Sequence, residues 1–452
     1  MKIFLRQNLI AFIVLLIATT CAHARSSEKT TQPKKPWTII VYIAADNDLR
    51  GFAARNIKQM AAIGSNSFCN ICVELHMRIS GNKKISRRYY IEQNNIVHVN
   101  ALDPNTQKMD SGDPKTLVKC CGWAIEDYPA DNYALILWNH GTGIIDPTSG
   151  RIINANELFA FNPVINKLEL DRSVGFLDFL EMKYGQDERG ICWDDSTGNY
   201  LNNQKLEAAL HEIQTIHLKG QKLSILGFDA CLMSMLEVAN IAKKHAHILV
   251  SSQEVELGTG WNYQLVLQPF MHGALDRTAF ARHIVQAYNA TYQKITDDFT
   301  LSALDLNAID ALESNVSMVG ALLAEGLRRQ QNNSIRQAIS LSRDKSQCTH
   351  FDEPSYLDLH HLYSNLLTHL NSMHLGTESD SSDFRAGLAY SLREGCSLIK
   401  RIALANTTGK NLHLAHGISI YFPENRIHYS YRKTNFAATN EWANFLTHYL
   451  IK

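Results

Sequence analysis

The sequence has no excess of charge of either sign, because its 452 residues include 44 Lys and Arg and 44 Asp and Glu. This balance gives no general electrostatic attraction to nucleic acid or to anionic lipid, and neither is expected as a partner. The chain also has no low-complexity tract and no repeat at a fixed period. With 45% apolar and 19% charged residues, it has the composition of a globular protein.

Long apolar runs are absent except near the N-terminus. Lys2 and Arg6 precede an apolar stretch, residues 9–20, that is too short to span a membrane. Residues 22–24, Ala-His-Ala, then provide a small-x-small cleavage signal. We therefore expect residues 1–24 to be a secretory signal peptide, and the mature protein to be secreted or periplasmic and free of the membrane.

Cysteine is too sparse to hold the fold together. Of nine cysteines, one lies in the leader, and the rest are spread over a long chain, unlike those of a disulfide scaffold. Cys69 and Cys72 form a C-x-x-C, but positions three apart in a strand face opposite sides, which disfavours zinc chelation. The 19 histidines include no H-E-x-x-H, which also argues against a zinc enzyme.

The chain does contain an alternation of buried strands and amphipathic helices. Apolar runs at 37–46, 133–141 and 222–231 predict strands, and segments of helical periodicity lie between them. Such alternation produces βαβ units. We therefore expect an α/β fold: a three-layer sandwich with a mostly parallel central sheet flanked by helices.

The pattern changes at several points along the chain. Residues 25–36 are polar, as in a linker or short pro-segment. The α/β pattern occupies 37–300 and forms the expected catalytic domain. It is interrupted at 142–190 by a long irregular insert with several basic residues, and irregular segments of this length are usually functional or mobile. Residues 301–452 predict a mostly helical C-terminal extension with one further strand at 417–423.

Two predicted strands end in reactive groups that a buried strand does not need. The sequence N-H-G follows one of them at 139–141, and D-A-C ends the other at 229–231. Sites in open α/β sheets form outside the carboxyl ends of the strands, so neighbouring strands would bring His140 and Cys231 together. A thiolate attacks carbonyl carbon, and a nearby imidazole can take the proton of the thiol. The sequence therefore predicts a Cys–His catalytic pair.

Two backbone N–H groups are candidates for the oxyanion hole that such an attack requires. Gly141 allows a close approach between backbone and substrate. The N–H of Cys231, at the predicted start of the next helix, is the second candidate donor.

Each of these residues also has a structural interpretation. A single buried cysteine is usually inert, and a histidine near a strand end is usually a satisfied structural residue. Finding both at the ends of separate strands favours catalysis. A cysteine-based α/β-hydrolase is disfavoured, because it requires G-x-[SC]-x-G and a histidine that comes last. Here the flank is D-A-C-L-M, and His140 precedes Cys231.

Seven stretches resemble the clostripain family of cysteine peptidases. They are WTIIVYIAADNDL, YALILWNHGTG, ICWDDSTGNYL, ILGFDACLMSMLEVA, SSQEVELGTGWNY, TLSALDLNAI and GISIYFP. They occur in family order over nearly the whole mature chain, and the resemblance is most specific around His140 and Cys231. It implies a caspase-like fold, related to caspases, legumains and gingipains, with His140 as catalytic base and Cys231 as nucleophile.

The resemblance also implies cleavage of protein or peptide substrates after arginine or lysine. Asp229 would then hold the basic side chain at the base of the specificity pocket. Its alternative role is to cap a helix that begins near Leu232.

The stretch SSQEVELGTGWNY is expected to form the other wall of the pocket. Gln253 and Glu254 are the expected substrate contacts. Glu256 is a candidate for a second acidic contact, which the sequence does not assign. Gly260 would make room for an extended peptide. Trp261 would pack on that peptide, or it is a core residue of a turn.

This chemistry requires no cofactor, but calcium is a candidate because some relatives depend on it. Asp194 and Asp195 offer hard oxygen ligands, although their spacing is not that of an EF-hand. A turn that shapes the substrate side of the cleft is the alternative.

The predicted protein is therefore a secreted, monomeric cysteine endopeptidase, made as a zymogen in which 142–190 or 25–36 obstructs the cleft until it is cut. The resemblance implies that 142–190 is a processing region, which the protein cuts itself. The alternative is a catalytically silent secreted binding protein on the same fold.

Overall fold

The computed structural model describes residues 33–80, 83–100, 109–145, 158–172, 190–328, 332–372 and 379–451. The described residues from Lys34 onwards form one compact unit. The predicted signal peptide and much of the 142–190 insert lie outside the described residues. Of the helices in the described ranges, none is long and apolar enough to cross a membrane.

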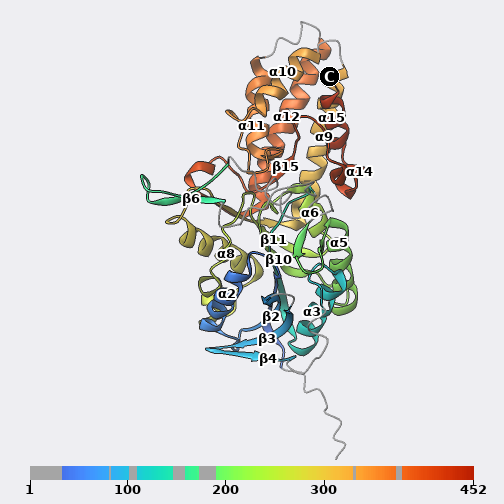
Figure 1. Cartoon of the computed structure of the whole chain (residues 1–452). Helices are drawn as coiled ribbons and strands as arrows, with labels where there is room; N and C mark the ends of the chain where they lie inside the picture. The colour runs from blue at the N-terminus through green and yellow to red at the C-terminus, as the bar shows by residue number, and fades with distance from the viewer. Residues whose placement is uncertain are drawn as a thin grey trace, which may run out of the picture. The chain divides into compact units, whose positions relative to one another are not determined.

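A nine-stranded sheet forms the centre of this unit, in the order β14-β12-β11-β10-β5-β1-β2-β3-β4 (Figure 1). Its parallel centre consists of β11 (Ala246–Ser251), β10 (Leu223–Asp229), β5 (Ala130–Trp138), β1 (Lys35–Ala45) and β2 (Cys69–Ser80). Antiparallel strands extend it at both edges. These are β3 (Lys83–Glu92) and β4 (Asn95–His98) on one side, and β12 (Thr300–Asp305) and β14 (Ala403–Thr408) on the other.

Helices cover both faces of the sheet. One face carries α2 (Arg50–Ile63), α7 (Tyr263–Leu267) and α8 (Arg277–Tyr292), and the other carries α3 (Pro114–Asp127), α5 (Asn203–Glu212) and α6 (Leu236–Ala242). Strand β1 shows why two cores form. Val41 and Ile43 pack in the first core, whereas Tyr42 and Ala44 pack in the second, because successive side chains point to opposite faces. The predicted three-layer α/β sandwich is confirmed.

Local sequence sets several helix ends. The side chain of Asp113 accepts a hydrogen bond from Lys115 N at 2.9 Å and caps α3, in which proline is the first residue. Asp276 caps α8 in the same way, through Ala279 N at 2.8 Å. Helix α2 ends at Gly64, whose φ of +70° favours glycine.

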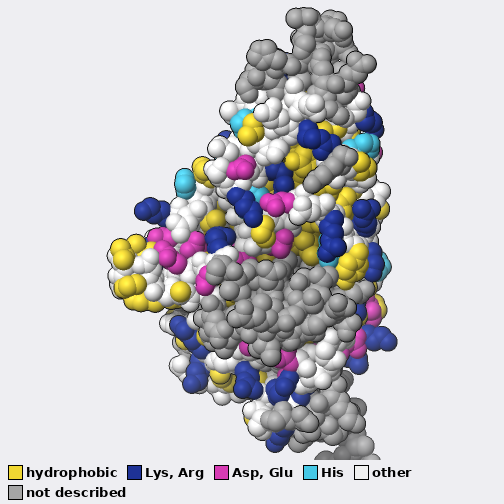
Figure 2. Space-filling model, turned by 45° about the horizontal axis from the view of Figure 1, so that its top comes forward, with side chains coloured by type: hydrophobic (Ala, Val, Ile, Leu, Met, Phe, Trp, Pro, Cys, Tyr) yellow, Lys and Arg dark blue, Asp and Glu magenta, His cyan; other side chains and the backbone are white. Residues whose placement is uncertain are grey.

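Two small hairpins follow β5 in the sequence. One is formed by β6 (Phe159–Asn162) and β7 (Lys167–Leu170), the other by β8 (Ile191–Asp194) and β9 (Asn199–Leu201). The first lies within the insert expected to be irregular, and the backbone N–H of Leu168 ties it to the body through Ile295 O at 2.7 Å. Apolar side chains gather on the projecting lobe at the left of Figure 2, and Phe161 and Val164 of this hairpin are exposed.

The C-terminal segment is more closely integrated than the sequence predicted. It contributes β14 and nearly all of β12 to the central sheet, and β13 (Tyr356–Asp358) pairs with β15 (Ser419–Tyr421). Its helices are α9 (Ile309–Arg328), α10 (Asn332–Ser342), α11 (Leu359–Ser372), α12 (Ser379–Ile402), α13 (Tyr429–Arg432), α14 (Asn435–Thr439) and α15 (Glu441–Leu450).

The expected boundary at residue 300 and the expectation of one strand in 301–452 are therefore wrong. Strand β12 begins at Thr300 and pairs antiparallel with β11, so the chain returns to the sheet edge at this point. Strands of three to six residues carry too little periodicity to be recognised among long helices.

Trp442 joins the last helix to the rest of the unit. Its side chain is fully buried, its Nε1 donates to Tyr421 O at 2.9 Å, and its ring lies edge-on to Phe422 with centroids 5.6 Å apart. We expect Trp442→Ala to lower the free energy of unfolding by about 3–5 kcal/mol, because it leaves a cavity in the core. Urea unfolding followed by circular dichroism measures this change.

Tyr390→Ala is the matched control, because that ring is 70% exposed and its loss should change stability by less than about 0.5 kcal/mol. Since the C-terminal segment shares the sheet, both variants should unfold in one transition. A separate early transition of the C-terminal helices would contradict this prediction.

Candidate active site

Cys231 and His140 leave adjacent parallel strands at the same edge of the sheet. In the register of β10 and β5, Asp229 lies opposite Trp138. Cys231 comes two residues after Asp229, and His140 comes two residues after Trp138. A Cβ atom on Gly141 would lie only 2.4 Å from the carbonyl oxygen of Cys231, so the two backbones are in contact. Both residues line one cavity of about 20 Å³, which has room for about one water molecule. The expected meeting of the two residues is observed.

A third residue completes this group, and the sequence analysis missed it. The Nε2 atom of His140 lies 2.8 Å from Oδ1 of Asp48. Asp48 follows β1, which pairs with β5 on the side opposite to β10. The carboxyl ends of three neighbouring strands therefore supply the carboxylate, the imidazole and the thiol. The rule that predicted the other two residues also applied to the sequence A-D-N-D-L after the first strand.

Hydrogen bonds from asparagine side chains to the backbone fix the turn that carries Asp48. The side-chain amide of Asn47 donates to Ala44 O at 2.9 Å and to Trp193 O at 3.1 Å, while its Oδ1 accepts from Leu49 N. Asn139 adds a second bridge, because its Oδ1 accepts from Trp193 N at 2.9 Å. These bonds hold the ends of β1 and β5 against the strand β8.

The thiol of Cys231 is buried in this form of the protein. Its side chain lies against the loop after β11, where Glu256 N donates to Sγ at 3.2 Å. Burial raises the pKa of Cys231 well above its ordinary value, although this hydrogen bond opposes the shift. The next residue, Leu232, has a φ of +62°, a strained value for a leucine. The thiol is thus neutral, and it sits on a strained turn.

The helix after Cys231 begins later than the sequence suggested. Helix α6 starts at Leu236, with Met235 at its N-cap position. The predictions that Cys231 begins the helix and that Asp229 could cap it are therefore wrong. The cause is the extended stretch after the strained turn, in which Met235 forms a bridge with Ser419.

Asp229 lies at the floor of the cavity, beside a second carboxyl group. Both its oxygens accept from Trp261 N at 3.1 Å, and Oδ2 also accepts from the Tyr263 hydroxyl at 2.8 Å. Burial raises the pKa of Asp229 to about 7, which these hydrogen bonds partly offset. Burial and the nearby Asp229 together raise the pKa of Glu256 well above its ordinary value. Of the two acidic candidates that the sequence offered, Glu256 is the one that lines the cavity with Asp229.

Gly260 and Trp261 have different roles at this floor. Gly260 has a φ of +62°, and a Cβ there would lie 2.8 Å from both oxygens of Asp229, so only glycine fits. The ring of Trp261 is buried in the core, and only its backbone N–H reaches Asp229. The turn-and-core alternative for Trp261 is therefore correct, and its ring cannot pack on a peptide here.

Gln253 and Glu254 do not face the cavity, contrary to expectation. The amide of Gln253 donates to Asp358 at 3.1 Å, and its oxygen accepts from Gly417 N at 2.8 Å. The buried carboxylate of Glu254 binds Arg172 at 2.8 Å. Strand β11 ends at Ser251, so the residues after it do not follow the alternation of a strand.

The cavity is closed by residues that flank it. Leu158, the residue before β6, lines the cavity together with Leu49, and both side chains are buried. A peptide cannot enter a space of about 20 Å³. The cavity in this form is therefore too small for a peptide side chain.

Asp194 and Asp195 do not fit a calcium ion. Asp194 contacts the ammonium group of Lys84 and accepts from Ser111 N at 2.9 Å. Asp195 accepts from Trp193 Nε1 at 2.7 Å. A cation at Asp194 would meet the charge of the buried lysine. Across the described ranges, no group of three or more His, Cys, Asp or Glu residues could hold a metal ion.

All eight cysteines from Cys69 to Cys396 are free thiols, so none of these described residues forms a disulfide with another. Burial raises the pKa of Cys69 to about 12. Cys231 is the cysteine that shares a cavity with His140.

Comparison with known proteins identifies relatives along most of the chain. The profile of the Clostripain family matches residues 41–165 and 178–449. Clostripain of Hathewaya histolytica is 28% identical over 327 residues, which are 67% of this chain and 52% of the relative. This chain thus spans about half the length of that curated relative.

Two solved structures share the fold. A secreted C11 cysteine protease from Bacteroides thetaiotaomicron, bound to an irreversible peptide inhibitor, has a TM-score of 0.58 at 18% identity, covering 90% of this chain and 99% of that one. An inactive zymogen C11 protease from Parabacteroides distasonis has a TM-score of 0.55 at 18% identity, covering 90% and 98%. At such identities the likeness supports the fold alone.

The contact between Asp48 and His140 predicts a role in orienting the imidazole. Asp48→Asn should lower kcat for a peptide amide by roughly 100-fold or more and change KM little, because an amide cannot stabilise the imidazolium. Steady-state kinetics measure both constants. Asp113→Asn is the control, since asparagine also caps α3. An Asp48→Asn variant with more than half of the wild-type kcat would contradict the assignment.

Proposed function

The chain belongs to the clostripain family, and on that basis we propose that it is a secreted cysteine endopeptidase that cleaves peptide bonds after arginine or lysine. The observation that carries the proposal is the joint cavity of Cys231 and His140, with the carboxyl groups of Asp229 and Glu256 at its floor. A nucleophile, a base and an acidic floor are the parts that such a reaction needs.

The proposed reaction begins when His140 takes the proton of the Cys231 thiol. Because Nε2 of His140 is bonded to Asp48, we assign this transfer to Nδ1. The sulfur then attacks the carbonyl carbon of the residue in the pocket. The N–H groups of Gly141 and Cys231 stabilise the resulting oxyanion.

Breakdown of this intermediate releases the first product. His140 gives its proton to the leaving amine as the C–N bond breaks, and an acyl-enzyme thioester remains. A water molecule then attacks the thioester and loses a proton to His140. The C–S bond breaks, the new carboxyl terminus leaves, and the proton returns to Cys231.

The acidic floor supports a basic substrate side chain. Burial raises the pKa of both carboxyl groups, and the neighbouring Asp229 raises that of Glu256 further, because two carboxyl groups side by side cannot both ionise easily. An entering guanidinium or ammonium group would lower them again and pair with the charge. The site therefore favours a cation over a neutral side chain.

The closed cavity supports synthesis as a zymogen. Leu158 lines the cavity, and the neutral buried thiol of Cys231 is a weak nucleophile. A cut within residues 142–190 would free the chain around Leu158 to move away from the cavity. We propose that the protein makes this cut itself, after a basic residue.

Replacement of the nucleophile tests the activity and the self-cleavage together. Cys231→Ala should abolish turnover of arginyl and lysyl peptide amides and leave the chain uncut, because no other group forms the thioester. Intact mass and N-terminal sequencing of pure wild-type protein should locate a cut after Arg or Lys. Cys396→Ala, at a half-buried thiol outside the site, should behave like the wild type.

Two outcomes would count against the proposal. If pure Cys231→Ala protein is still cut, self-cleavage is wrong. If the processed wild type hydrolyses neither arginyl nor lysyl substrates, the silent binding protein becomes the better description.

The raised pKa of Asp229 predicts a pH dependence for cation binding. Below about pH 7 the carboxyl is protonated, so the Ki of benzamidine should rise roughly tenfold per pH unit as the pH falls. Competitive inhibition between pH 5 and pH 8 measures it, with neutral benzamide as the control ligand. Tighter benzamidine binding at low pH would contradict the acidic floor.

A further inference from the structure

The loop after His140 ends against a residue from the C-terminal segment. Residues 142–145 follow the candidate oxyanion donor Gly141, and Tyr356 lies against them. Tyr356 belongs to β13, 214 residues beyond Thr142 in the chain, and its side chain is fully buried. A distant part of the sequence thus contacts the catalytic loop.

One hydroxyl group makes three hydrogen bonds to this loop. The Tyr356 hydroxyl donates to Thr142 O at 2.6 Å and accepts from Ile144 N at 3.1 Å and from Ile145 N at 2.9 Å. A phenolic hydroxyl has one hydrogen and two acceptor sites, so its capacity is fully used. Because Ile144 and Ile145 are buried, water cannot replace the hydroxyl as the hydrogen-bond partner of their N–H groups.

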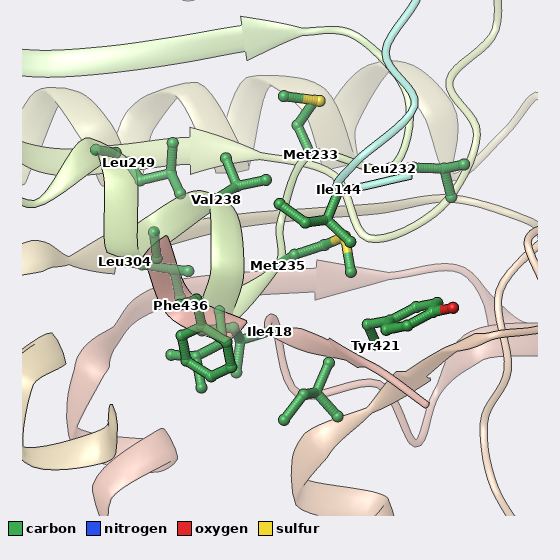
Figure 3. Close-up of a cluster of buried hydrophobic side chains, with 14 of the residues drawn as sticks. Ile144, Leu232, Met233, Met235, Val238, Leu249, Leu304, Ile418, Tyr421 and Phe436 are labelled. Atoms are coloured by element: carbon green, nitrogen blue, oxygen red, sulfur yellow. The ribbon is translucent and has the colours of Figure 1, made fainter. Parts of the chain in front are cut away.

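The ring of Tyr356 also fixes how closely the loop approaches. Gly143 has a φ of +65°, and a Cβ there would lie 2.7 Å from Cε2 of the Tyr356 ring. That Cβ would also lie 2.9 Å from Leu232 O, on the turn of the nucleophile. Figure 3 shows Ile144 in the same apolar cluster as Leu232 and Met235. The loops of His140 and Cys231 therefore meet beside Tyr356.

We propose that Tyr356 is a positioning residue for the oxyanion hole. Its three hydrogen bonds hold residues 142–145 so that the N–H of Gly141 stays directed at the attacked carbonyl. Tyr356 touches none of the reacting atoms and acts through the backbone alone. The inference rests on the proposed peptidase function.

A matched pair of variants tests this role. Tyr356→Phe removes the hydroxyl and keeps the ring. Tyr421→Phe is the control, because Tyr421 lies opposite Tyr356 in the same two-stranded sheet, with ring centroids 6.4 Å apart. The Tyr421 hydroxyl accepts from His428 N at 2.9 Å and does not bond the catalytic loop.

Two reactions of Cys231 separate positioning from general damage. Amide hydrolysis passes through an oxyanion, whereas alkylation by iodoacetamide forms a C–S bond as iodide leaves and creates no oxyanion. In processed Tyr356→Phe we expect kcat to fall about tenfold and KM to stay within about twofold of the wild-type value. This loss is smaller than the roughly 10²–10³-fold loss of kcat that follows deletion of an oxyanion-hole donor. The rate of inactivation by iodoacetamide should stay within about twofold. Tyr421→Phe should leave all three values within about twofold.

Amide hydrogen exchange gives a readout that needs no turnover. In the Cys231→Ala background, the amides of residues 142–145 should exchange faster in Tyr356→Phe and at an unchanged rate in Tyr421→Phe. If exchange is unchanged in Tyr356→Phe, the proposal is wrong, whatever the activity.

The remaining outcomes are also decisive. Equal kcat in the two tyrosine variants overturns the proposal. So does a parallel loss of kcat and alkylation rate, or a Tyr356→Phe protein that fails to fold while Tyr421→Phe folds, because each indicates a purely structural role. If the wild type shows no thiol-dependent turnover, the proposed peptidase function is wrong. The positioning role is then wrong as well, even if hydrogen exchange shows that Tyr356 holds the loop.

Discussion

The alignment of three parallel strands is the constraint on which the rest of the site depends. Hydrogen bonding between β10, β5 and β1 fixes their register, so that their carboxyl ends reach one edge of the sheet together. That alignment places the thiol, the imidazole and the carboxylate of Asp48 close together. A slip of one residue in either pairing would turn the final side chains to the other face.

Burial explains the chemical state of this group. The same exclusion of water that strengthens electrostatic contacts in the pocket keeps the thiol of Cys231 neutral and raises the pKa of Asp229. In the closed cavity the thiol is therefore unreactive as well as inaccessible. Opening the cavity would relieve the burial that raises the pKa of Cys231 and would admit a substrate in the same event.

The C-terminal segment supports the site through contacts with the loops that carry its residues. Its strands extend the sheet beyond β11, Asp358 accepts from Gln253, and Tyr356 bonds the loop after His140. These contacts link residues far apart in the chain to the two catalytic loops. The segment is thus part of the framework of the site, and removing it would leave buried backbone groups without partners.

The sequence by itself determined the layered α/β architecture and the pair His140 and Cys231, because strand and helix periodicity and reactive groups at strand ends are local signals. It did not determine which acidic residue after β11 faces the cavity, since a loop has no alternation to follow. Asp48 and Tyr356 also depended on the tertiary structure. Their roles arise from strand order and from contacts across up to 214 residues, and only the folded chain brings such groups within hydrogen-bonding distance.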